Sequence, residues 1–563
     1  MKRADILSSL QKTPDVDVLI VGAGINGIGT FRDLAINGVN VLLVDRADFA
    51  SGASAASSHM AHGGIRYLEN GEFRLVREAV RERNRMIENA PHIVRPLPTT
   101  IPMFKIFSGL LNAPLKFFNL LDRPSERGAL VIKIGLIFYD TFTRKQKTVP
   151  QHRFAARAKA LREFPALSPH VRYAATYYDG AILQPERLAV EMLLDAEADH
   201  PHARALNYAS LVGGKMNFVT LKDELTGDIF DVKPRLLINA AGPWIDEANA
   251  TLGLSTRFIG GTKGSHLILD NPELRAAIGE HEFFFENDDG RIVLIYPLFD
   301  KVLIGTSDLP VDNPDDVRCT EEEVAYFLEM VKKIFPAIDV KREEIVFRFS
   351  GVRPLERSGA KTTGQISRDH TIQVVSGVWT GQNYPIYSLV GGKWTSFRAF
   401  AEQVTDKALA FLEMPREKNT RDLPIGGGRN YPKNAEERQH VYEGLTAWTN
   451  LSDERVEQLF QRYGSRVEEV AMFLSDGSDV PLTAYPNFSR REIAFLVQKE
   501  KCIHLDDLLL RRTNLAKLGY LSRAGVNELA TILAEILGWD DAQQQAEIKR
   551  TLAIMADKYE VSL

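Results

Sequence analysis

The chain has 563 residues, of which 44% are hydrophobic and 25% are charged, which allows a large buried core and excludes a disordered protein. Lysine and arginine number 69 and aspartate and glutamate 74, giving a net charge of −5 without the blocks of like charge typical of nucleic-acid binding. The two cysteines, Cys319 and Cys502, are isolated and lack metal-ligand spacing. They indicate a reducing compartment, with neither a disulfide framework nor a metal site.

The first 17 residues begin with basic side chains but contain no apolar run of signal-peptide length, which predicts a cytoplasmic protein. Residues 15–22 then predict a buried strand, 25–38 a helix and 39–45 a second strand, which together form a βαβ unit. A charged amphipathic helix is predicted at about 72–88, with its arginines on a solvated face.

Residues 100–140 are rich in apolar and aromatic side chains, but lysines and arginines interrupt them too often for a membrane span. Two interpretations stay open. The segment lies on a membrane surface with its basic residues towards anionic lipid, or it is an ordinary core-facing insertion with exposed lysines.

Further strands are predicted at 218–223, 235–242, 266–270, 291–298 and 302–308. Their mixture with helices predicts an α/β fold, in which a Rossmann-like dinucleotide-binding domain carries an inserted, mostly antiparallel substrate-binding sheet. After the Gly- and Pro-rich joint at 423–432 the periodicity becomes helical, as in the last predicted helix, which ends near Gly538. We therefore predict a domain over 1–422 with an interleaved substrate-binding region, and an all-α domain over 423–563.

The motif GAGING places Gly22, Gly24 and Gly27 in G-x-G-x-x-G spacing between the first strand and its helix. These glycines allow a tight turn, a close approach to pyrophosphate and close helix packing, in that order. Asp45 ends the next strand, where a carboxylate can bind a ribose hydroxyl. The combination predicts a cofactor that contains ADP, and a glycine-rich turn that binds nothing would have to explain all three features.

The choice between NAD and FAD depends on more distant segments. A single fingerprint indicates that a bound FAD would be reduced directly by the substrate, because flavoenzymes reduced by NAD(P)H commonly carry a second one. A strand leading into NAAGPW (239–244) and the glycine pair of LVGGKWTSF (389–397), which enters a predicted helix, both favour a flavin.

The ordered motifs GAGING, SSHMAHGGIRYLE, INAAGPW, GTKGSHLIL, VLIGTSD, SGVRPL, ISRDH, GGKWTSF and DDLLLRRTNL resemble the FAD-dependent glycerol-3-phosphate dehydrogenases, which are respiratory, membrane-associated enzymes. The match covers nearly the whole chain, and HGGIRYLE with GVRPL and RRT is its most specific part. The resemblance implies FAD as the cofactor, sn-glycerol 3-phosphate as the substrate and hydride transfer to the flavin. It also implies membrane quinone as the acceptor and a peripheral location on the cytoplasmic face of the inner (plasma) membrane. Whether the protein forms a homodimer is left open.

The resemblance also implies roles for individual residues. A phosphomonoester requires cations, and a neutral histidine is a suitable base for an alcohol proton. The catalytic residues are then His266 as the base and Arg353 as the cation for the alkoxide or the phosphate. The implied substrate-binding residues are Arg66, Tyr67, Lys263, Arg368 and Lys393. The implied cofactor-binding residues are Gly22, Gly24, Gly27, Asp45, Ser57, Ser58, His62, Gly63, Gly64, Ala241, Gly242, Trp244, Gly392, Lys393, Trp394 and Thr395.

The chain also departs from the family pattern. His59 and Met60 stand where a Lys-Leu pair is common, Trp394 replaces an aliphatic residue, and the insertion around 106–127 is long. These differences leave the substrate open, and erythritol phosphate is an alternative. An oxidase that uses oxygen is a second alternative, whereas the cation cluster disfavours a flavin-holding scaffold or an amino-acid oxidase. Arg511, Arg512 and Thr513 either pair within helices or dock the C-terminal domain on the catalytic one.

Overall fold

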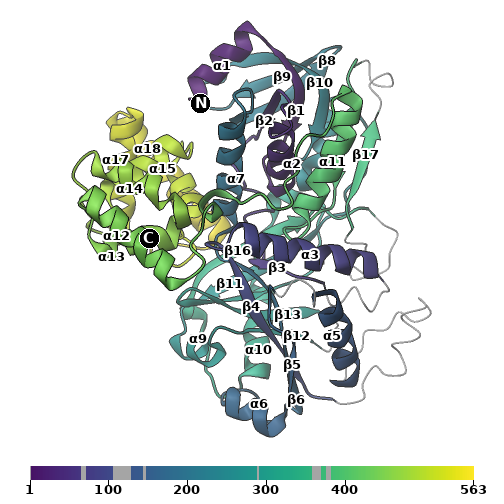
Figure 1. The fold of residues 1–563 in the computed structure, drawn as a ribbon, viewed down its shortest axis with the longest axis vertical. Helices are drawn as coiled ribbons and strands as arrows, with labels where there is room; N and C mark the ends of the chain where they lie inside the picture. The colour runs from purple at the N-terminus through teal and green to yellow at the C-terminus, as the bar shows by residue number, and fades with distance from the viewer. Residues whose placement is uncertain are drawn as a thin grey trace.

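The computed structural model describes residues 2–64, 72–105, 129–143, 148–287, 291–357, 369–375 and 382–563. It has an upper part around a parallel sheet, a lower part around a second sheet, and a helical region at one side of both (Figure 1). Three of the predicted substrate residues, Arg66, Tyr67 and Arg368, lie outside the described residues, and so do residues 106–128 of the candidate membrane segment.

The first sheet is built on parallel strands that are buried on both faces. Its strand order is β17-β18-β10-β1-β2-β7, and along this order all neighbouring pairs are parallel except β17 with β18. Helices α2 (Ile25–Ala35), α7 (Pro185–Asp199) and α11 (Phe397–Leu412) cover one face, and α1 (Arg3–Lys12) covers the other. The strands are β1 (Asp15–Val21), β2 (Val41–Val44), β7 (Arg204–Leu206), β10 (Ile229–Asn239), β17 (Thr371–Val375) and β18 (Ile386–Val390), with the hairpin β8 (Ala209–Lys215) and β9 (Phe218–Asp223) paired to β10. Continuous apolar runs are typical of such strands.

The second sheet follows the order β15-β11-β14-β13-β12-β4-β6-β3, with β16 paired to β11 and β5 to β6. All of its pairs are antiparallel except β12 with β4. Its strands are β3 (Met60–Ala61), β4 (Val94–Met103), β5 (Arg153–Ala156), β6 (Tyr173–Ile182), β11 (Thr262–Leu269), β12 (Glu282–Glu286), β13 (Ile292–Leu298), β14 (Lys301–Gly305), β15 (Leu309–Pro310) and β16 (Ile345–Arg353). One face packs on α6 (Arg157–Glu163), α9 (Pro272–Ile278) and α10 (Glu321–Ile334).

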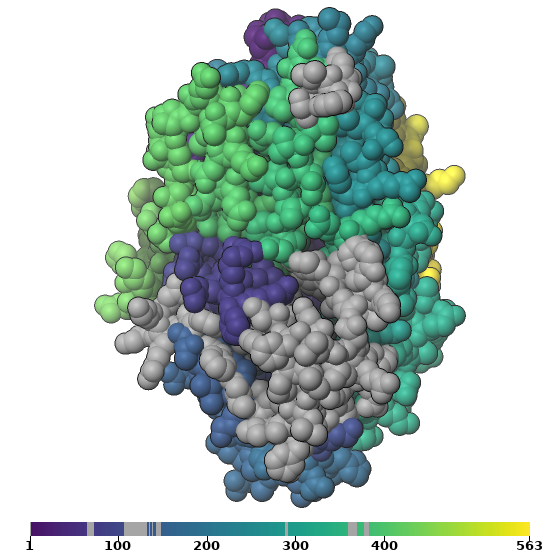
Figure 2. Space-filling view, turned by 90° about the vertical axis from the view of Figure 1, so that its right-hand side faces the viewer, coloured from purple at the N-terminus to yellow at the C-terminus, as the bar shows by residue number. Residues whose placement is uncertain are grey.

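Helix α3 (Phe73–Asn89) lies between the two sheets and crosses the middle of the face shown in Figure 2, where it is purple. Its apolar side packs with α5 (Ala129–Thr143) against β4 and β6 of the second sheet. The amphipathic helix predicted at about 72–88 is therefore confirmed, but its arginines do not all lie on a solvated face, because Arg83 is fully buried and donates to the Tyr139 hydroxyl and the Tyr178 carbonyl.

The C-terminal region is helical from Ala435 to Tyr559, and its apolar core continues into that of the second sheet. Tyr559 stacks on Phe347 of β16 with ring centroids 4.6 Å apart. Its elements are α12 (Ala435–Thr449), α13 (Asp453–Tyr463), α14 (Val467–Ser475), α15 (Arg490–Lys499), α16 (Leu505–Asp507), the π-helical turn η9 (Leu508–Arg512), α17 (Arg523–Leu537) and α18 (Asp541–Tyr559). Helix α17 ends at Gly538 in the left-handed conformation, as predicted.

The predicted α/β fold class is confirmed, including the βαβ unit, the inserted sheet and the helical C-terminal region. The sequence did not predict α1, which lies at the basic N-terminal segment and buries Ile6 and Leu10. No helix in the described part of the chain has both the length and the apolar content to cross a bilayer.

Candidate active site

The turn after β1 has the close backbone packing that its glycines predict. Gly22 adopts a φ of 104°, and a Cβ built on it would lie 2.5 Å from the Ala240 carbonyl oxygen. A Cβ on Gly27 would lie 1.9 Å from the carbonyl oxygen of Gly22, so a side chain would push α2 away from the turn. Gly24 is the N-cap of α2 and makes no side-chain cap. This positive helix end suits a pyrophosphate.

Asp45 lies at the end of β2 and joins that strand to the glycine turn. Its carboxylate accepts hydrogen bonds from the amides of Ala23, at 2.7 Å, and Ala47, at 3.0 Å. Burial raises the pKa of Asp45 to about 6 despite these two bonds. A ribose hydroxyl donating to this carboxylate would favour its ionised form. Asp45 thus lies beside the glycine turn, and its contact with a ribose stays a prediction.

The GGKW segment meets the same turn from another part of the chain. Gly392 has a φ of 87°, and a Cβ on it would lie 2.5 Å from Nδ2 of Asn26, in the first turn of α2. Asn26 Nδ2 donates to the Gly391 carbonyl at 3.1 Å. Trp394 Nε1 donates to the Ser54 carbonyl at 3.1 Å, so its indole is held by the loop that follows Asp45. The structure thus brings the predicted cofactor residues of both segments together.

Residues of the SSHMAHGG motif adjoin the GGKW segment. The His62 amide donates to the Thr395 hydroxyl at 3.0 Å, which joins two predicted cofactor residues that are 333 positions apart. Ser57 accepts the amide of His59 at 3.3 Å and so shapes the turn itself. Lys393 is half-buried. Burial raises the pKa of Glu72, and the positive charge of Lys393 lies close enough to oppose that rise.

Gly63 is tightly enclosed. Its amide donates to Asp179 Oδ1 at 2.9 Å, and a Cβ on it would lie 2.0 Å from the hydroxyl oxygen of Tyr139. Tyr139 also donates to Asp179, and Arg83 donates to Tyr139, at 2.6 and 2.8 Å. Gly64 has a φ of 73° and is the last described residue of the motif. The two glycines allow the main chain to pass closely over β6.

The NAAGPW segment leads from β10 into a short 3-10 turn, Gly242–Trp244, which follows Ala241. Trp244 Nε1 donates to Asp315 Oδ1 at 3.0 Å, and the Arg46 guanidinium stacks 4.7 Å above the indole. Trp244 therefore borders the loop after Asp45.

His266 of β11 is the centre of the second group of predicted residues. Its Nε2 is 2.8 Å from the Ser58 hydroxyl, and its ring stacks on Phe349 of β16 with centroids 4.8 Å apart. Gly305 of β14 makes room for it, because a Cβ there would lie 2.2 Å from the imidazole. Burial, followed by the charge of Arg353, lowers the pKa of His266 to about 3. The imidazole is therefore neutral near pH 7.

Arg353 lies at the end of β16, on the same sheet face as His266. Its guanidinium donates to Asp308 at 3.1 Å and to the Thr306 hydroxyl at 3.0 Å. Gly264 lies between the two side chains in β11, and a Cβ there would lie 2.3 Å from Arg353 Nη2. The glycines at 264 and 305 thus create the space that a buried base and a cation need.

Lys263 lies on the opposite face of β11 from His266. Its ammonium group donates to Glu323 at 2.9 Å and to the Arg318 carbonyl at 2.6 Å, and its side chain is only 9% exposed. The reason is the alternation of side chains along a strand, because residues three apart point to opposite faces. The structure therefore does not bring Lys263 together with His266 and Arg353, although the resemblance had grouped all three.

Sequence reasoning missed three carboxylates next to the predicted residues. Asp179 holds Gly63, Asp308 pairs with Arg353, and Asp48 accepts hydrogen bonds from two C-terminal arginines. Asp179 is charged within the otherwise uncharged strand YAATYYDGAI, which is a signal because buried acids need partners. Asp48 and Asp308 lie in loops, where a charge is unremarkable.

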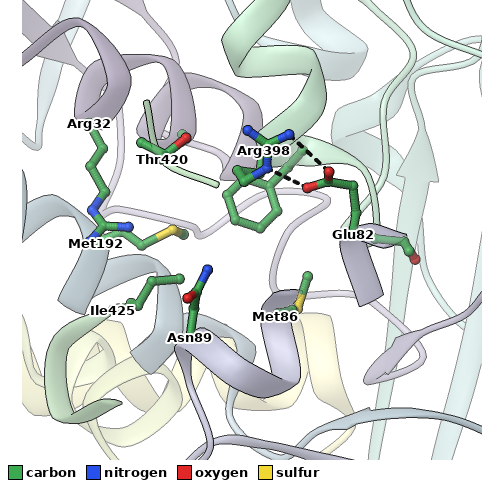
Figure 3. A pocket seen from close by; sticks show the side chains of 11 residues that line it. Arg32, Glu82, Met86, Asn89, Met192, Arg398, Thr420 and Ile425 are labelled. Atoms are coloured by element: carbon green, nitrogen blue, oxygen red, sulfur yellow. Dashed lines mark hydrogen bonds and ion pairs between the residues drawn. The ribbon is translucent and has the colours of Figure 1, made fainter. Parts of the chain in front are cut away.

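A separate small cavity lies between α2, α3, α7 and α11, with Arg398 and Glu82 paired at its rim (Figure 3). Thr395 contributes to its wall. Its volume of about 20 Å³ suffices for one water molecule, so we assign no ligand to it.

Two family models match the chain. Residues 17–406 match the model described as FAD dependent oxidoreductase, and residues 418–544 match the C-terminal domain of alpha-glycerophosphate oxidase.

Proteins similar along nearly the whole chain include a glycerol-3-phosphate dehydrogenase of Synechocystis sp., which is 32% identical over 560 residues and covers 95% of each chain. A protein of the same name from Pseudomonas aeruginosa is 32% identical over 515 residues, which are 89% of this chain and 91% of that one. The solved glycerol-3-phosphate dehydrogenase from Bacillus halodurans, complexed with FAD, has a TM-score of 0.75 at 21% identity and covers 99% of this chain and 97% of that one, which shows a shared fold.

Proposed function

Because the chain belongs to the family of FAD-dependent glycerol-3-phosphate dehydrogenases, we propose that it oxidises sn-glycerol 3-phosphate to dihydroxyacetone phosphate with FAD as the hydride acceptor. The observation that supports this most strongly is the arrangement of a neutral, buried histidine and an arginine on one sheet face. The histidine lies beside a loop that also borders the dinucleotide turn.

The residues of the first sheet fit FAD. Gly22 and Gly27 allow a close-packed turn that side chains would disrupt, α2 directs its positive end to the turn, and Asp45 can accept from a ribose hydroxyl. Gly392, Trp394 and Thr395 would lie along the flavin, together with Gly63 and Gly64. When bound, FAD supplies the acceptor for the hydride that leaves the carbinol carbon.

His266 would accept the proton of the substrate hydroxyl. With Nε2–H of His266 donating to the Ser58 hydroxyl, the lone pair at Nδ1 would be left for the proton. A pKa of about 3 gives little driving force for this transfer. The negative charge of a bound phosphate would raise that pKa and make the imidazole a better base.

Cations would hold the phosphate and the developing alkoxide. Arg353 offers a planar guanidinium beside the base, and Asp308 and Thr306 fix its orientation. We propose Lys393, Arg66, Tyr67 and Arg368 as further substrate contacts, of which the last three lie outside the described residues. Lys263 is assigned to its ion pair with Glu323 instead.

The rest of the proposed reaction concerns electrons and location. We propose that membrane quinone takes the electrons, with the protein attached peripherally to the cytoplasmic face of the inner (plasma) membrane and able to form a homodimer. The composition of residues 106–128, which lie outside the described residues, supports the surface contact. The flanking parts of the predicted 100–140 segment pack instead in the core of the second sheet, as the end of β4 and as α5. We also propose that the domain boundary lies at 422–423, in the Gly-rich joint.

The first experiment is an anaerobic titration of the purified protein with sn-glycerol 3-phosphate while the visible flavin spectrum is recorded. Bleaching near one equivalent supports the proposal. If erythritol phosphate bleaches the flavin and sn-glycerol 3-phosphate does not, the substrate assignment changes to erythritol phosphate. A protein that holds no flavin even after reconstitution would contradict the proposal. Reoxidation of the bleached flavin by a soluble quinone faster than by oxygen separates the dehydrogenase from the oxidase.

A further inference from the structure

The C-terminal region contacts the upper part of the molecule through a buried cluster of charges at the turn η9. Asp48 is fully buried and accepts from Arg511 Nε at 2.6 Å and from Arg512 Nη1 and Nη2 at 2.8 and 3.0 Å. Burial opposes ionisation of Asp48, but the two guanidinium groups outweigh it and hold the pKa below its usual value. A buried ion pair adds little net stability over an apolar contact of similar size, but its hydrogen-bond geometry can specify where the paired side chains lie. This cluster therefore defines where Asp48 lies.

Asp48 belongs to the loop of residues 45–58, which we call the 45–58 loop. This loop begins at Asp45 and contacts the start of α2 through Ser54, whose hydroxyl accepts the amide of Ile25 at 2.9 Å. It ends at Ser58, which is hydrogen bonded to His266 Nε2. One loop therefore runs from the predicted cofactor turn to the predicted base, and the C-terminal arginines hold it at an intermediate point.

The same part of the C-terminal region also reaches the far end of the loop. Lys517 forms a buried ion pair with Glu186 of α7, and its ammonium group lies 3.4 Å from the Ala55 carbonyl. His59, which follows Ser58, is buried, and the charge of Lys517 adds to burial in lowering the pKa of His59 well below its usual value.

Contacts with β16 complete this arrangement. Gly519 lies directly on β16, where a Cβ would come within 2.5 Å of Val346, and β16 carries Phe349 and Arg353. Phe349 is the residue on which His266 stacks. Residues 511–519 thus contact two of the elements that enclose the histidine, the 45–58 loop and β16. Two consecutive arginines reach one carboxylate from a π-helical turn, a distortion that is frequent at functional sites.

We propose that Arg511 and Arg512 are positioning residues for His266, which act by holding Asp48 and thereby the 45–58 loop that presents Ser58. The C-terminal region would then be a part of the catalytic apparatus that touches neither substrate nor flavin. This inference rests on the proposed function. A misplacement of about 1 Å in such a contact can reduce a rate by about 100-fold.

The test compares Arg512→Lys with a matched control, Arg455→Lys. Lysine keeps the charge of Arg512 but cannot form the two-pronged contact with Asp48. Arg455 also joins two carboxylates, Asp479 and Glu492, but it lies within the C-terminal region and away from the loop. The limiting rate of flavin reduction per bound flavin and the half-saturating concentration of sn-glycerol 3-phosphate are measured anaerobically by stopped flow.

The expected result for Arg512→Lys is a 10- to 100-fold lower limiting rate, roughly the cost of a small misplacement, with an unchanged half-saturating concentration. Arg455→Lys should retain the wild-type rate. In a Ser58→Ala background, Arg512→Lys should have little further effect, because the contact that transmits it is already lost. Three results would each overturn the proposal: additive effects of Ser58→Ala and Arg512→Lys, an unchanged limiting rate in Arg512→Lys, or an equal loss of limiting rate in Arg455→Lys.

A second measurement does not depend on turnover. Hydrogen exchange of the peptide covering 48–58 should be faster in Arg512→Lys than in wild type and Arg455→Lys, and Asp48→Asn replaces Arg512→Lys if that variant does not fold. Unchanged exchange in this peptide would contradict the proposal. A wild-type flavin that sn-glycerol 3-phosphate does not reduce would refute the proposed function instead, while the exchange result would still test the positioning of the loop.

Discussion

The two sheets collect their functional residues in different ways. In the parallel sheet, the turn that fits the cofactor is formed mainly by one stretch, Gly22 to Gly27, followed closely by Asp45. In the second sheet, His266 depends on Phe349 from β16, Gly305 from β14 and Ser58 from the 45–58 loop. A cofactor can thus be held by local backbone geometry, whereas a buried base needs side chains from several elements. The predictions below test this difference.

The largest effect is expected in the glycine turn. The substitution Gly27→Ala places a methyl group 1.9 Å from the Gly22 carbonyl oxygen, so α2 must move away from the turn. We expect the protein to be purified without flavin and not to be reconstituted by added FAD. Gly444→Ala is the control, because Gly444 lies in α12 with open space around its Cβ position. If Gly27→Ala binds flavin like wild type, the cofactor does not depend on this close packing.

The next effect concerns the second sheet alone. Glutamine at 266 can still form a hydrogen bond with Ser58 but cannot accept a proton, so His266→Gln should keep its flavin and reduce it about 10²- to 10⁴-fold more slowly. Anaerobic stopped-flow absorbance measures this rate. Ser265→Ala changes the neighbouring residue on the opposite face of β11 and should have nearly the wild-type rate. A near-normal rate in His266→Gln would exclude the histidine as the base.

These two regions also differ in how far their sequence predicted them. The turn was predictable because the G-x-G-x-x-G spacing between a strand and a helix is a local signature of dinucleotide binding. The spacing did not show that the backbone packed against Gly22 comes from Ala240. His266, the proposed base, and Arg353 were predicted through the family resemblance, and the structure brings them together across β11 and β16.

What the sequence did not predict depends on long-range contacts. Nothing near Asp48 indicates that Arg511 and Arg512, more than 460 positions away, hold its carboxylate. Lys263 is instructive, because the predicted strand began at His266, whereas β11 begins at Thr262, and its period-2 alternation places Lys263 on the opposite face from His266. Whether that face met the substrate or a helix could not be read from the strand, since α10 supplies Glu323 from a separate segment.

The two faces of β11 lead to a third prediction. Lys263→Met leaves Glu323 as a buried carboxylate without its ammonium partner, which should lower the free energy of unfolding by about 3–5 kcal/mol. The half-saturating concentration of substrate should stay within about twofold of wild type, because we place Lys263 outside the pocket. The double variant Lys263→Met with Glu323→Gln removes the stranded charge and should recover part of the stability. A large rise in the half-saturating concentration in a stable variant would return Lys263 to the substrate site.

The smallest expected effect is a pH dependence of stability. The pKa of His266 is lowered to about 3 in the folded protein, chiefly by burial, whereas an unfolded histidine titrates near 6.5. Between these two pKa values the unfolded chain binds more protons than the folded protein does. The free energy of unfolding therefore falls as the pH decreases below about 6.5, and above that pH this histidine does not change it. At pH 5.5 this one group should cost about 1.4 kcal/mol.

Urea unfolding at pH 7.5 and pH 5.5 measures that loss, with His266→Gln as the variant and the exposed His440→Gln as the control. His266→Gln should lose less stability on acidification than wild type, and His440→Gln should lose as much as wild type. Equal losses in all three proteins would mean that the imidazole is not held neutral by the second sheet. Because Gly305 and Phe349 enclose the ring, such a result would also contradict the role of the sheet in preparing a neutral base.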